Sequence, residues 1–236
     1  VLAEYRHHHL EKEVNELHSK EYAVVGGGEM PIFELARDLR GFENLMIDMM
    51  SNQEMAKILL DKITDIRCGM ARRYAESGAD ILSLGDDVGS QEKMLMSPDT
   101  WRIWLKPRLK RVIESAKEVN PDMLVYYHSD GYIEPIIPDL IEVGVDILNP
   151  VQPECMDPAK IKERYGDRLA FFGTIGIQIT MPHGTPKDVK REVKTRIDTV
   201  GKDGRLLIAP THVLESDVPW ENILAFFNAV EEYGKY

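Results

Sequence analysis

A histidine and an aspartate stand two positions apart where a short apolar run ends. His128 directly follows the run 125–127, and Asp130 comes two residues later. Gly131 allows a sharp turn after them, so that both side chains can face one point. Histidine and carboxylate are ordinary zinc ligands, and a catalytic zinc takes about three protein ligands and keeps one open position. The spacing therefore predicts either a metal site or a histidine that Asp130 holds in place as part of the structure.

A second histidine, His212, also follows an apolar run, residues 206–211. If both runs belong to one barrel, His212 can approach His128 across the mouth where the strands end. Two histidines at strand ends indicate function more strongly than either one alone. We expect His212 either to bind a metal or to contact a substrate.

Two adjacent aspartates, Asp86 and Asp87, close the run 80–85. Neighbouring side chains of a strand point to opposite faces, so we expect only one of the two carboxylates to face the site. That carboxylate could act as a general base or bind a cationic group of a substrate. The alternative is a structural carboxylate that accepts hydrogen bonds from loop amides.

Neutral polar side chains follow the remaining strands and could hydrogen-bond a substrate. These residues are Asn149, Gln152, Thr174 and Thr211. Cys155 is the only cysteine near these strand ends, so it is a candidate soft metal ligand. A loop thiol without a role is the alternative, which we favour.

Short strands alternate with amphipathic helices along the chain, and this alternation must position the candidate residues. The β-branched and aromatic runs predict strands at 21–26, 80–85, 123–127, 145–149, 169–173 and 205–209. Apolar residues at helical spacing predict helices at 53–76, 98–119, 133–143, 159–165, 186–200 and 219–233. Ser97, Asp157 and Thr185 each precede a proline, which is typical of a helix N-cap. Strict rotation of strand and helix implies parallel strands with right-handed crossovers.

Two α/β architectures fit this alternation, the doubly wound sheet and the (β/α)8 barrel. No G-x-G-x-x-G sequence opens a helix, which disfavours a dinucleotide-binding sheet. Polar residues follow almost every strand, and a barrel collects all its strand ends around one mouth, whereas an open sheet uses only those at its switch point. We therefore predict one barrel domain over residues 1–236, with six of its strands recognised in the sequence.

Composition and missing motifs exclude several classes of protein. The chain has 29 Lys and Arg against 40 Asp and Glu, a net charge of −11, which argues against nucleic acid or an anionic membrane surface as a partner. Two cysteines cannot form a disulfide framework, and with 11 methionines they fit a reducing cytoplasm. No apolar run approaches the roughly 20 residues of a membrane span. Without a Walker loop, a G-x-S-x-G elbow or an H-E-x-x-H motif, the sequence gives no support to an ATPase, a serine hydrolase or a zincin.

Six stretches of the chain resemble the uroporphyrinogen decarboxylase superfamily in sequence, order and spacing. They are residues 80–87, 128–131, 145–152, 172–176, 207–212 and 217–223. The resemblance covers nearly the whole chain and implies a (β/α)8 TIM barrel of the uroporphyrinogen decarboxylase type. It also implies that about two N-terminal βα units of the eight in such a barrel are lacking here. The chain opens at Val1, without an initiator methionine or a signal peptide.

The superfamily has two well-known activities, and the resemblance implies one of them here. The first is zinc-dependent methyl transfer between a corrinoid protein and a thiol. The second is decarboxylation of uroporphyrinogen, a cofactor-free lyase reaction on a tetrapyrrole. The methyltransferase branch holds zinc with a His-x-Cys pair and a cysteine after the last strand. By this resemblance His128 matches the first ligand, Asp130 stands where the first cysteine would be, and His212 lies at or beside the position of the second.

We therefore expect an enzyme, a uroporphyrinogen decarboxylase-like methyltransferase that moves a methyl group between a small methylated or thiol substrate and a corrinoid protein. Zinc would assist, cobalamin would be carried by the partner protein, and a homo-oligomer is possible. The expected metal ligands are His128, Asp130 and His212. The expected catalytic residues are Asp86, Asp87, His128 and His212, and the expected substrate-binding residues are Asn149, Gln152, Thr174 and Thr211. The alternatives are a uroporphyrinogen decarboxylase without any cofactor and an inactive or binding-only family member.

Overall fold

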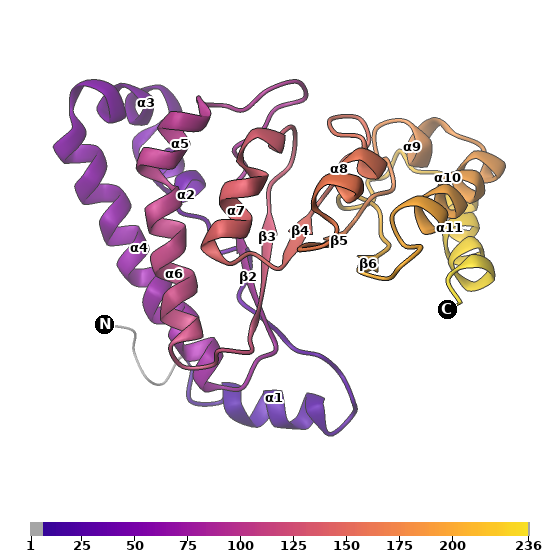
Figure 1. Ribbon diagram of the computed structural model, residues 1–236, viewed down its shortest axis with the longest axis horizontal. Helices are drawn as coiled ribbons and strands as arrows, with labels where there is room; N and C mark the ends of the chain where they lie inside the picture. Colours follow the sequence, from indigo (N-terminus) through magenta and orange to yellow (C-terminus); the bar gives the residue numbers. More distant parts are fainter. Residues whose placement is uncertain (1–6, 236) are drawn as a thin grey trace. The chain divides into compact units, whose positions relative to one another are not determined.

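The computed structural model describes residues 7–235 (Figure 1). Its strands are β1 (Val25–Gly26), β2 (Ile81–Gly85), β3 (Leu124–His128), β4 (Ile147–Asn149), β5 (Ala170–Phe172) and β6 (Leu206–Leu207). Its helices are α1 (Leu10–His18), α2 (Phe33–Arg40), α3 (Phe42–Ser51), α4 (Gln53–Glu76), α5 (Pro98–Trp104), α6 (Lys106–Lys117), α7 (Ile137–Val143), α8 (Pro158–Tyr165), α9 (Thr180–His183), α10 (Pro186–Thr199) and α11 (Trp220–Tyr233). Five strands lie inside the ranges that the sequence predicts, and β3 extends one residue beyond its predicted range 123–127, to His128.

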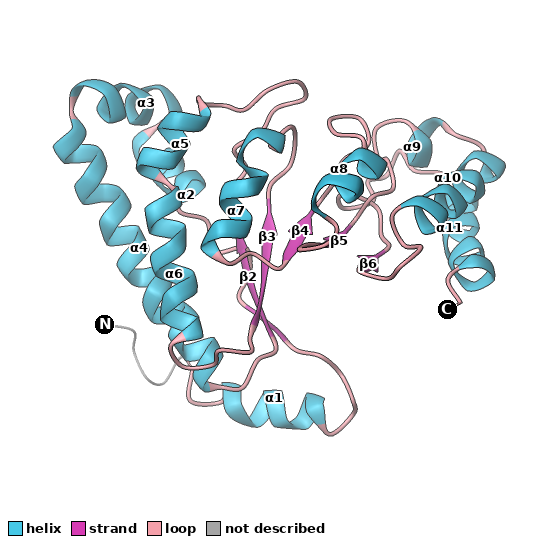
Figure 2. Ribbon diagram, in the orientation of Figure 1, coloured by secondary structure: helices cyan, strands magenta, loops and turns pink. Residues whose placement is uncertain are grey.

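The strands form one parallel sheet whose spatial order is their order in the sequence. Figure 2 shows the strands in magenta and the helices in cyan. The longest pairing joins β2 to β3, from Ile81 opposite Leu124 to Gly85 opposite His128. In β2, four consecutive residues are buried, because helices of a parallel sheet cover its strands on their faces. Parallel strands joined by helices confirm the predicted α/β class, and the residues from 7 to 235 supply six strands of the barrel type.

Contacts divide the chain into two compact units. The first holds the chain up to Val88 together with Leu95–His128 and Pro135–Asp146, and the second holds Gly89–Met94, Ser129–Glu134 and the chain from Ile147 onward. In the first unit α4 packs along α6, and in the second α10 packs along α11 (Figure 1). That the chain forms a single domain stays a prediction.

Each unit has its own apolar interior. In the first, Trp101, Phe33 and Leu60 are fully buried. In the second, a cluster of buried residues joins α9, α10 and α11 to the segment after β5; its members are Ile175, Met181, Val189, Val193, Phe226 and Ala229. No helix among residues 7–235 combines the length and the apolar character that crossing a membrane requires.

The predicted N-caps are all present. The Ser97 side chain accepts a hydrogen bond from the amide of Thr100 at the start of α5. Asp157 accepts from two amides at the start of α8, and Thr185 forms a reciprocal capping box with Asp188 at the start of α10. These caps fix where α5, α8 and α10 begin after the loops that follow β2, β4 and β5.

Besides the unpredicted short helix α9 and a 3-10 turn at Glu134–Ile136 before α7, the helices differ from the prediction in two larger places. The predicted helix 98–119 is divided into α5 and α6 at Leu105, because Pro107 lacks the amide that would continue the hydrogen-bond ladder. The stretch between β1 and α4, left unassigned in the sequence, folds into α2 and α3. Gly41 separates them with φ of 82°, a left-handed conformation that favours glycine.

Candidate metal and substrate site

The first aspartate after β2, Asp86, is 6% exposed and accepts hydrogen bonds from the backbone. Its Oδ1 atom lies 3.0 Å from the amide nitrogen of Glu34, and the amides of Ile32 and Phe33 also donate to this carboxyl. Burial raises the pKa of Asp86 to about 7, although these amides pull the pKa down. Asp86 therefore has the contacts of a carboxylate that anchors the beginning of α2, and its catalytic role stays a prediction.

The second aspartate, Asp87, faces the end of the neighbouring strand. Its side chain is 35% exposed, and its Oδ1 atom lies 3.5 Å from Nε2 of His128. The amide of Asp87 donates to the Glu34 carboxylate at 3.2 Å, so the same α2 residue holds both aspartates. The two carboxylates thus have different surroundings, as the alternation of side chains along a strand predicts.

His128 ends β3 opposite Gly85, the last residue of β2. Only 12% of its side chain is exposed. A Cβ atom at Gly85 would lie 3.1 Å from the Cβ atom of His128, so glycine lets the two strand ends come close together. This pairing is what brings a side chain that follows β2 to the histidine that ends β3.

Three side chains form a donor group of the kind that holds a metal ion. One donor atom each from Asp87, His128 and Asp130 lies within 4.8 Å of the other two. One imidazole nitrogen and two carboxylate oxygens suit zinc or a similar divalent ion. Zinc bonds of about 2 Å in tetrahedral geometry place ligand atoms roughly 3.3 Å apart, so this group must contract slightly on binding. The chemistry of the donor set therefore fits the expected metal.

The predicted ligand His212 lies beside Asp130. Its Nε2 atom is 3.9 Å from Oδ2 of Asp130, and the two side chains are 43% and 29% exposed. Among the described residues, the donor group whose atoms lie within 4.8 Å of one another consists of Asp87, His128 and Asp130. Its third member is Asp87, whereas the sequence suggests His212 as the third ligand. The predicted roles of His128, Asp130 and His212 as metal ligands stay predictions.

The four neutral residues predicted to bind substrate are all buried. Nδ2 of Asn149 donates to the carbonyl of Phe172 at 2.8 Å, and Oε1 of Gln152 accepts from the amide of Gly131 at 2.6 Å. These bonds connect the loop after β4 to β5 and to the turn that carries Asp130. The hydroxyls of Thr174 and Thr211 are buried without a hydrogen-bond partner among residues 7–235.

Cys155 has a partner that the sequence did not suggest. Its Sγ atom donates to Oε1 of Gln91 at 2.8 Å. Burial raises the pKa of the Cys155 thiol, and the nearby charges of Glu154 and Asp130 raise it further. A raised pKa favours the protonated thiol, whereas a metal ligand must be the thiolate. Cys155 therefore has the character of a hydrogen-bond donor.

Sequence reasoning missed Glu34, which contacts both aspartates after β2. Its position on α2 could have been recognised from the amphipathic stretch that begins at Phe33. Gln91 was also missed, and no local pattern marks it, because its partners Cys155 and Gln178 come from distant parts of the chain.

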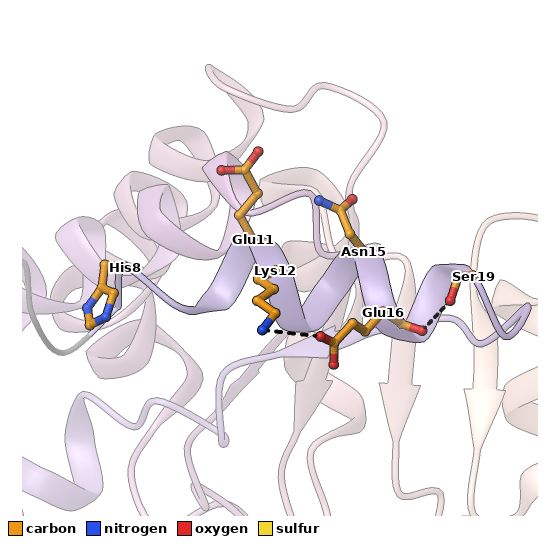
Figure 3. A pocket seen from close by; sticks show the side chains of 6 residues that line it. All are labelled: His8, Glu11, Lys12, Asn15, Glu16 and Ser19. Atoms are coloured by element: carbon orange, nitrogen blue, oxygen red, sulfur yellow. Dashed lines mark hydrogen bonds and ion pairs between the residues drawn. The ribbon is translucent and has the colours of Figure 1, made fainter.

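A shallow surface hollow lies along α1 and has different chemistry (Figure 3). It is lined by His8, Glu11, Lys12, Asn15, Glu16 and Ser19. Nζ of Lys12 lies 3.6 Å from the Glu16 carboxylate, and both side chains are mostly exposed. Exposed pairs of this kind add little energy. None of the lining residues belongs to the donor group of Asp87, His128 and Asp130. The hollow therefore plays no part in the site at the strand ends.

Comparisons with known proteins bear on the family of the chain. Residues 9–233 match the model of the uroporphyrinogen decarboxylase (URO-D) family. A methylcobamide:CoM methyltransferase MtaA from Methanosarcina barkeri is 30% identical over 222 residues, which cover 94% of this chain and 62% of the relative. A uroporphyrinogen decarboxylase from Chlorobium limicola is 26% identical over 181 residues, 77% of this chain and 46% of the relative.

Among solved structures, a methyltransferase from Methanosarcina mazei matches with a TM-score of 0.75 and 26% identity, covering 96% of this chain and 64% of that protein. The chain thus spans less than two thirds of the length of each of these three relatives. The resemblance noted in the sequence is confirmed by a family model that matches 9–233 and by a parallel sheet with its strands in chain order. The chain belongs to the uroporphyrinogen decarboxylase family.

Proposed function

We propose that this chain carries the active site of a methyltransferase that moves a methyl group between a corrinoid protein and a small thiol or methylated substrate. The donor group of Asp87, His128 and Asp130 is the observation that carries the proposal. The methyltransferase names of relatives at 30% and 26% identity support it. Cobalamin would arrive on the partner protein, and the cytoplasmic location stays a prediction.

In this proposal Asp87, His128 and Asp130 hold one zinc ion, with His212 close to Asp130. A bound zinc would act as a Lewis acid that lowers the pKa of a substrate thiol or improves a leaving group. With nitrogen and oxygen donors alone, the site is harder than the sulfur-containing site expected for the methyltransferase branch. A harder donor set leaves more positive charge on the metal, which favours binding of an anionic substrate atom.

The surrounding residues hold these ligands in place. Asp86 and Glu34 connect the strand end at Asp87 to the beginning of α2. Gln152 accepts the amide of Gly131, the residue after Asp130. Hydrogen bonds behind the ligands limit their side-chain motion, which raises metal affinity. The buried hydroxyls of Thr174 and Thr211 would contact the substrate.

Metal analysis and a transfer assay test this function. We expect roughly one zinc per chain, lost in the His128→Ala/His212→Ala double variant. With methylcobalamin and coenzyme M as probes, demethylation is followed by the change in the cobalamin absorbance. Removal of zinc should abolish the transfer, and its return should restore it. Full transfer by metal-free protein would contradict the zinc-assisted mechanism.

The second candidate is decarboxylation of uroporphyrinogen without a cofactor. The observation in its favour is the relative from Chlorobium limicola, which carries that name at 26% identity. Formation of coproporphyrinogen by the metal-free chain would support this candidate against methyl transfer. A chain that binds either probe and turns over neither would instead be a binding-only family member.

A further inference from the structure

A short hairpin lies between β2 and α5, at residues Gly89–Met94. Gly89 and Met94 form an antiparallel bridge. The amide and the hydroxyl of Ser90 both donate to the carbonyl of Lys93, each at 2.7 Å. Contacts place this hairpin in the second unit together with Asp130 and the loops that follow β4 and β5. Its internal bonds make it a preformed element, here called the site hairpin.

The backbone of the site hairpin packs directly against the backbone of the turn that follows His128. A Cβ atom at Gly89 would lie 2.5 Å from the carbonyl oxygen of Asp130 and 2.8 Å from the amide nitrogen of Tyr132. A Cβ atom at Gly131 would lie 2.6 Å from the carbonyl oxygen of Ser90. The amide of Tyr132 donates to that same carbonyl at 2.7 Å. Only two glycines allow this approach, because any side chain would force the backbones apart.

The side chain at the tip of the site hairpin joins two further loops. Nε2 of Gln91 donates to Oε1 of Gln178 at 2.6 Å, and Oε1 of Gln91 accepts from Sγ of Cys155 at 2.8 Å. Cys155 follows β4, and Gln178 follows β5. One carboxamide thus uses its donor and its acceptor on two different loops.

We propose that the site hairpin sets the position of Asp130, with Gly89 and Gln91 as positioning residues. This inference rests on the proposed function, because it treats Asp130 as a metal ligand. The backbone crossing fixes the carbonyl of Asp130 itself, so a shift there turns the carboxylate on the same residue. Ligand sites tolerate displacements of about 0.5 Å before affinity falls. The hydrogen bonds of Gln91 to Gln178 and Cys155 keep the site hairpin packed against the turn that carries Asp130.

A pair of glycine variants tests the crossing. In Gly89→Ala the new Cβ meets the carbonyl of Asp130 at 2.5 Å, and in Gly184→Ala it meets the carbonyl of Thr180 at the same 2.5 Å. The second variant is thus a control with the same nearest contact, at the end of α9, although its next contacts are wider, at 3.3 Å, than those at Gly89. Zinc affinity is measured by chelator competition, and thermal unfolding is measured alongside. We expect both variants to lose stability but only Gly89→Ala to bind zinc roughly ten-fold more weakly. Equal zinc affinity in the two variants would overturn the proposal.

A second variant, Gln91→Ala, keeps the backbone and removes the bonds of the tip. We expect roughly three-fold weaker zinc binding with an unchanged unfolding temperature, and this variant decides the matter if Gly89→Ala does not fold. We also expect roughly three-fold faster alkylation of Cys155 by iodoacetamide, because the thiol loses the nearer of its two acceptors and keeps only Oε1 of Gln152 at 3.6 Å. Cys68 on α4 serves as the internal reference in peptide mass spectrometry.

The two readouts separate this inference from the function on which it rests. If the wild-type chain binds no zinc, the metal part of the proposed function is wrong, and the alkylation of Cys155 alone decides whether the hairpin bonds exist. If the wild-type chain binds zinc but neither Gly89→Ala nor Gln91→Ala weakens the binding, the function stands and the positioning role is wrong. An alkylation rate of Cys155 unchanged by Gln91→Ala would also contradict the hairpin bonds.

Discussion

Two carboxylates at neighbouring strand ends are held by opposite means. Asp86, after β2, is 6% exposed and accepts backbone amides from the beginning of α2. Asp130, after β3, has 29% of its side chain exposed. Its backbone packs closely against the site hairpin, and Gly89 and Gly131 allow this approach. The first carboxyl contributes to folding through its own side chain. The second has its main chain held in place, and its carboxylate is partly exposed.

The largest effect that we expect from this difference is a loss of unfolding free energy when Asp86 is replaced. Asp86→Ala leaves several buried amides of the 32–34 segment without an acceptor, which costs about 2 to 3 kcal/mol of unfolding free energy. Urea unfolding at pH 4 measures this, because the contribution of Asp86 is close to full at that pH. Asp130→Ala should change the same free energy by less than about 0.5 kcal/mol, as expected for an accessible side chain. Equal losses of unfolding free energy in Asp86→Ala and Asp130→Ala would show that the two carboxylates contribute equally to stability.

For zinc affinity we expect the reverse order, with the larger effect from replacing Asp130. Asp130→Ala removes a donor atom and should weaken zinc binding by roughly ten- to a hundred-fold. Asp130→Asn keeps the shape of the side chain but not its charge, and should lie between wild type and Asp130→Ala. Chelator competition at pH 7 gives both values. Wild-type affinity in Asp130→Ala would show that Asp130 is not a ligand.

The titration of Asp86 should make the unfolding free energy depend on pH. The pKa of Asp86 is raised from 3.8 to about 7 in the folded chain, so the folded state binds more protons than the unfolded state between these values. The contribution of Asp86 is therefore full below pH 4 and is lost as the pH rises through 7, with a slope of at most about 1.4 kcal/mol per pH unit.

Asp86→Asn should remove this part of the slope, because its amide does not titrate. Urea unfolding from pH 4 to pH 8 measures both chains. The charge of Glu34 raises the pKa of Asp86 further, and Asp86 in turn interacts with Arg67. An identical slope in wild type and Asp86→Asn would assign the titration to another group.

The smallest effect concerns His212, which lies 3.9 Å from Asp130. If this histidine only orients the aspartate, His212→Ala should weaken zinc binding by roughly three-fold, the effect of losing one contact between partly exposed polar side chains. A loss as large as that of Asp130→Ala would instead make His212 a ligand, as the sequence resemblance implies. The same chelator titration distinguishes the two roles.

Local patterns were sufficient for much of the fold. Five strands lie within the predicted ranges and β3 exceeds its range by His128 alone, and the caps at Ser97, Asp157 and Thr185 are present. Both signals arise from residues near each other in sequence. The division at Leu105 was missed although Pro107 marks it. The segment between β1 and α4 was left unassigned, and it holds the helix whose amides receive Asp86.

By itself the sequence determined the alternation of strands and helices, the family, and the candidate pair His128 and Asp130, since spacing along the chain needs no partner. Only the tertiary structure decided that Asp87 joins that pair, because Gly85 must first lie opposite His128. It also decided that Asp86 is buried and that Gly89 crosses the Asp130 turn. These contacts join residues that are distant in sequence, and only the packing of strands, helices and loops brings them together.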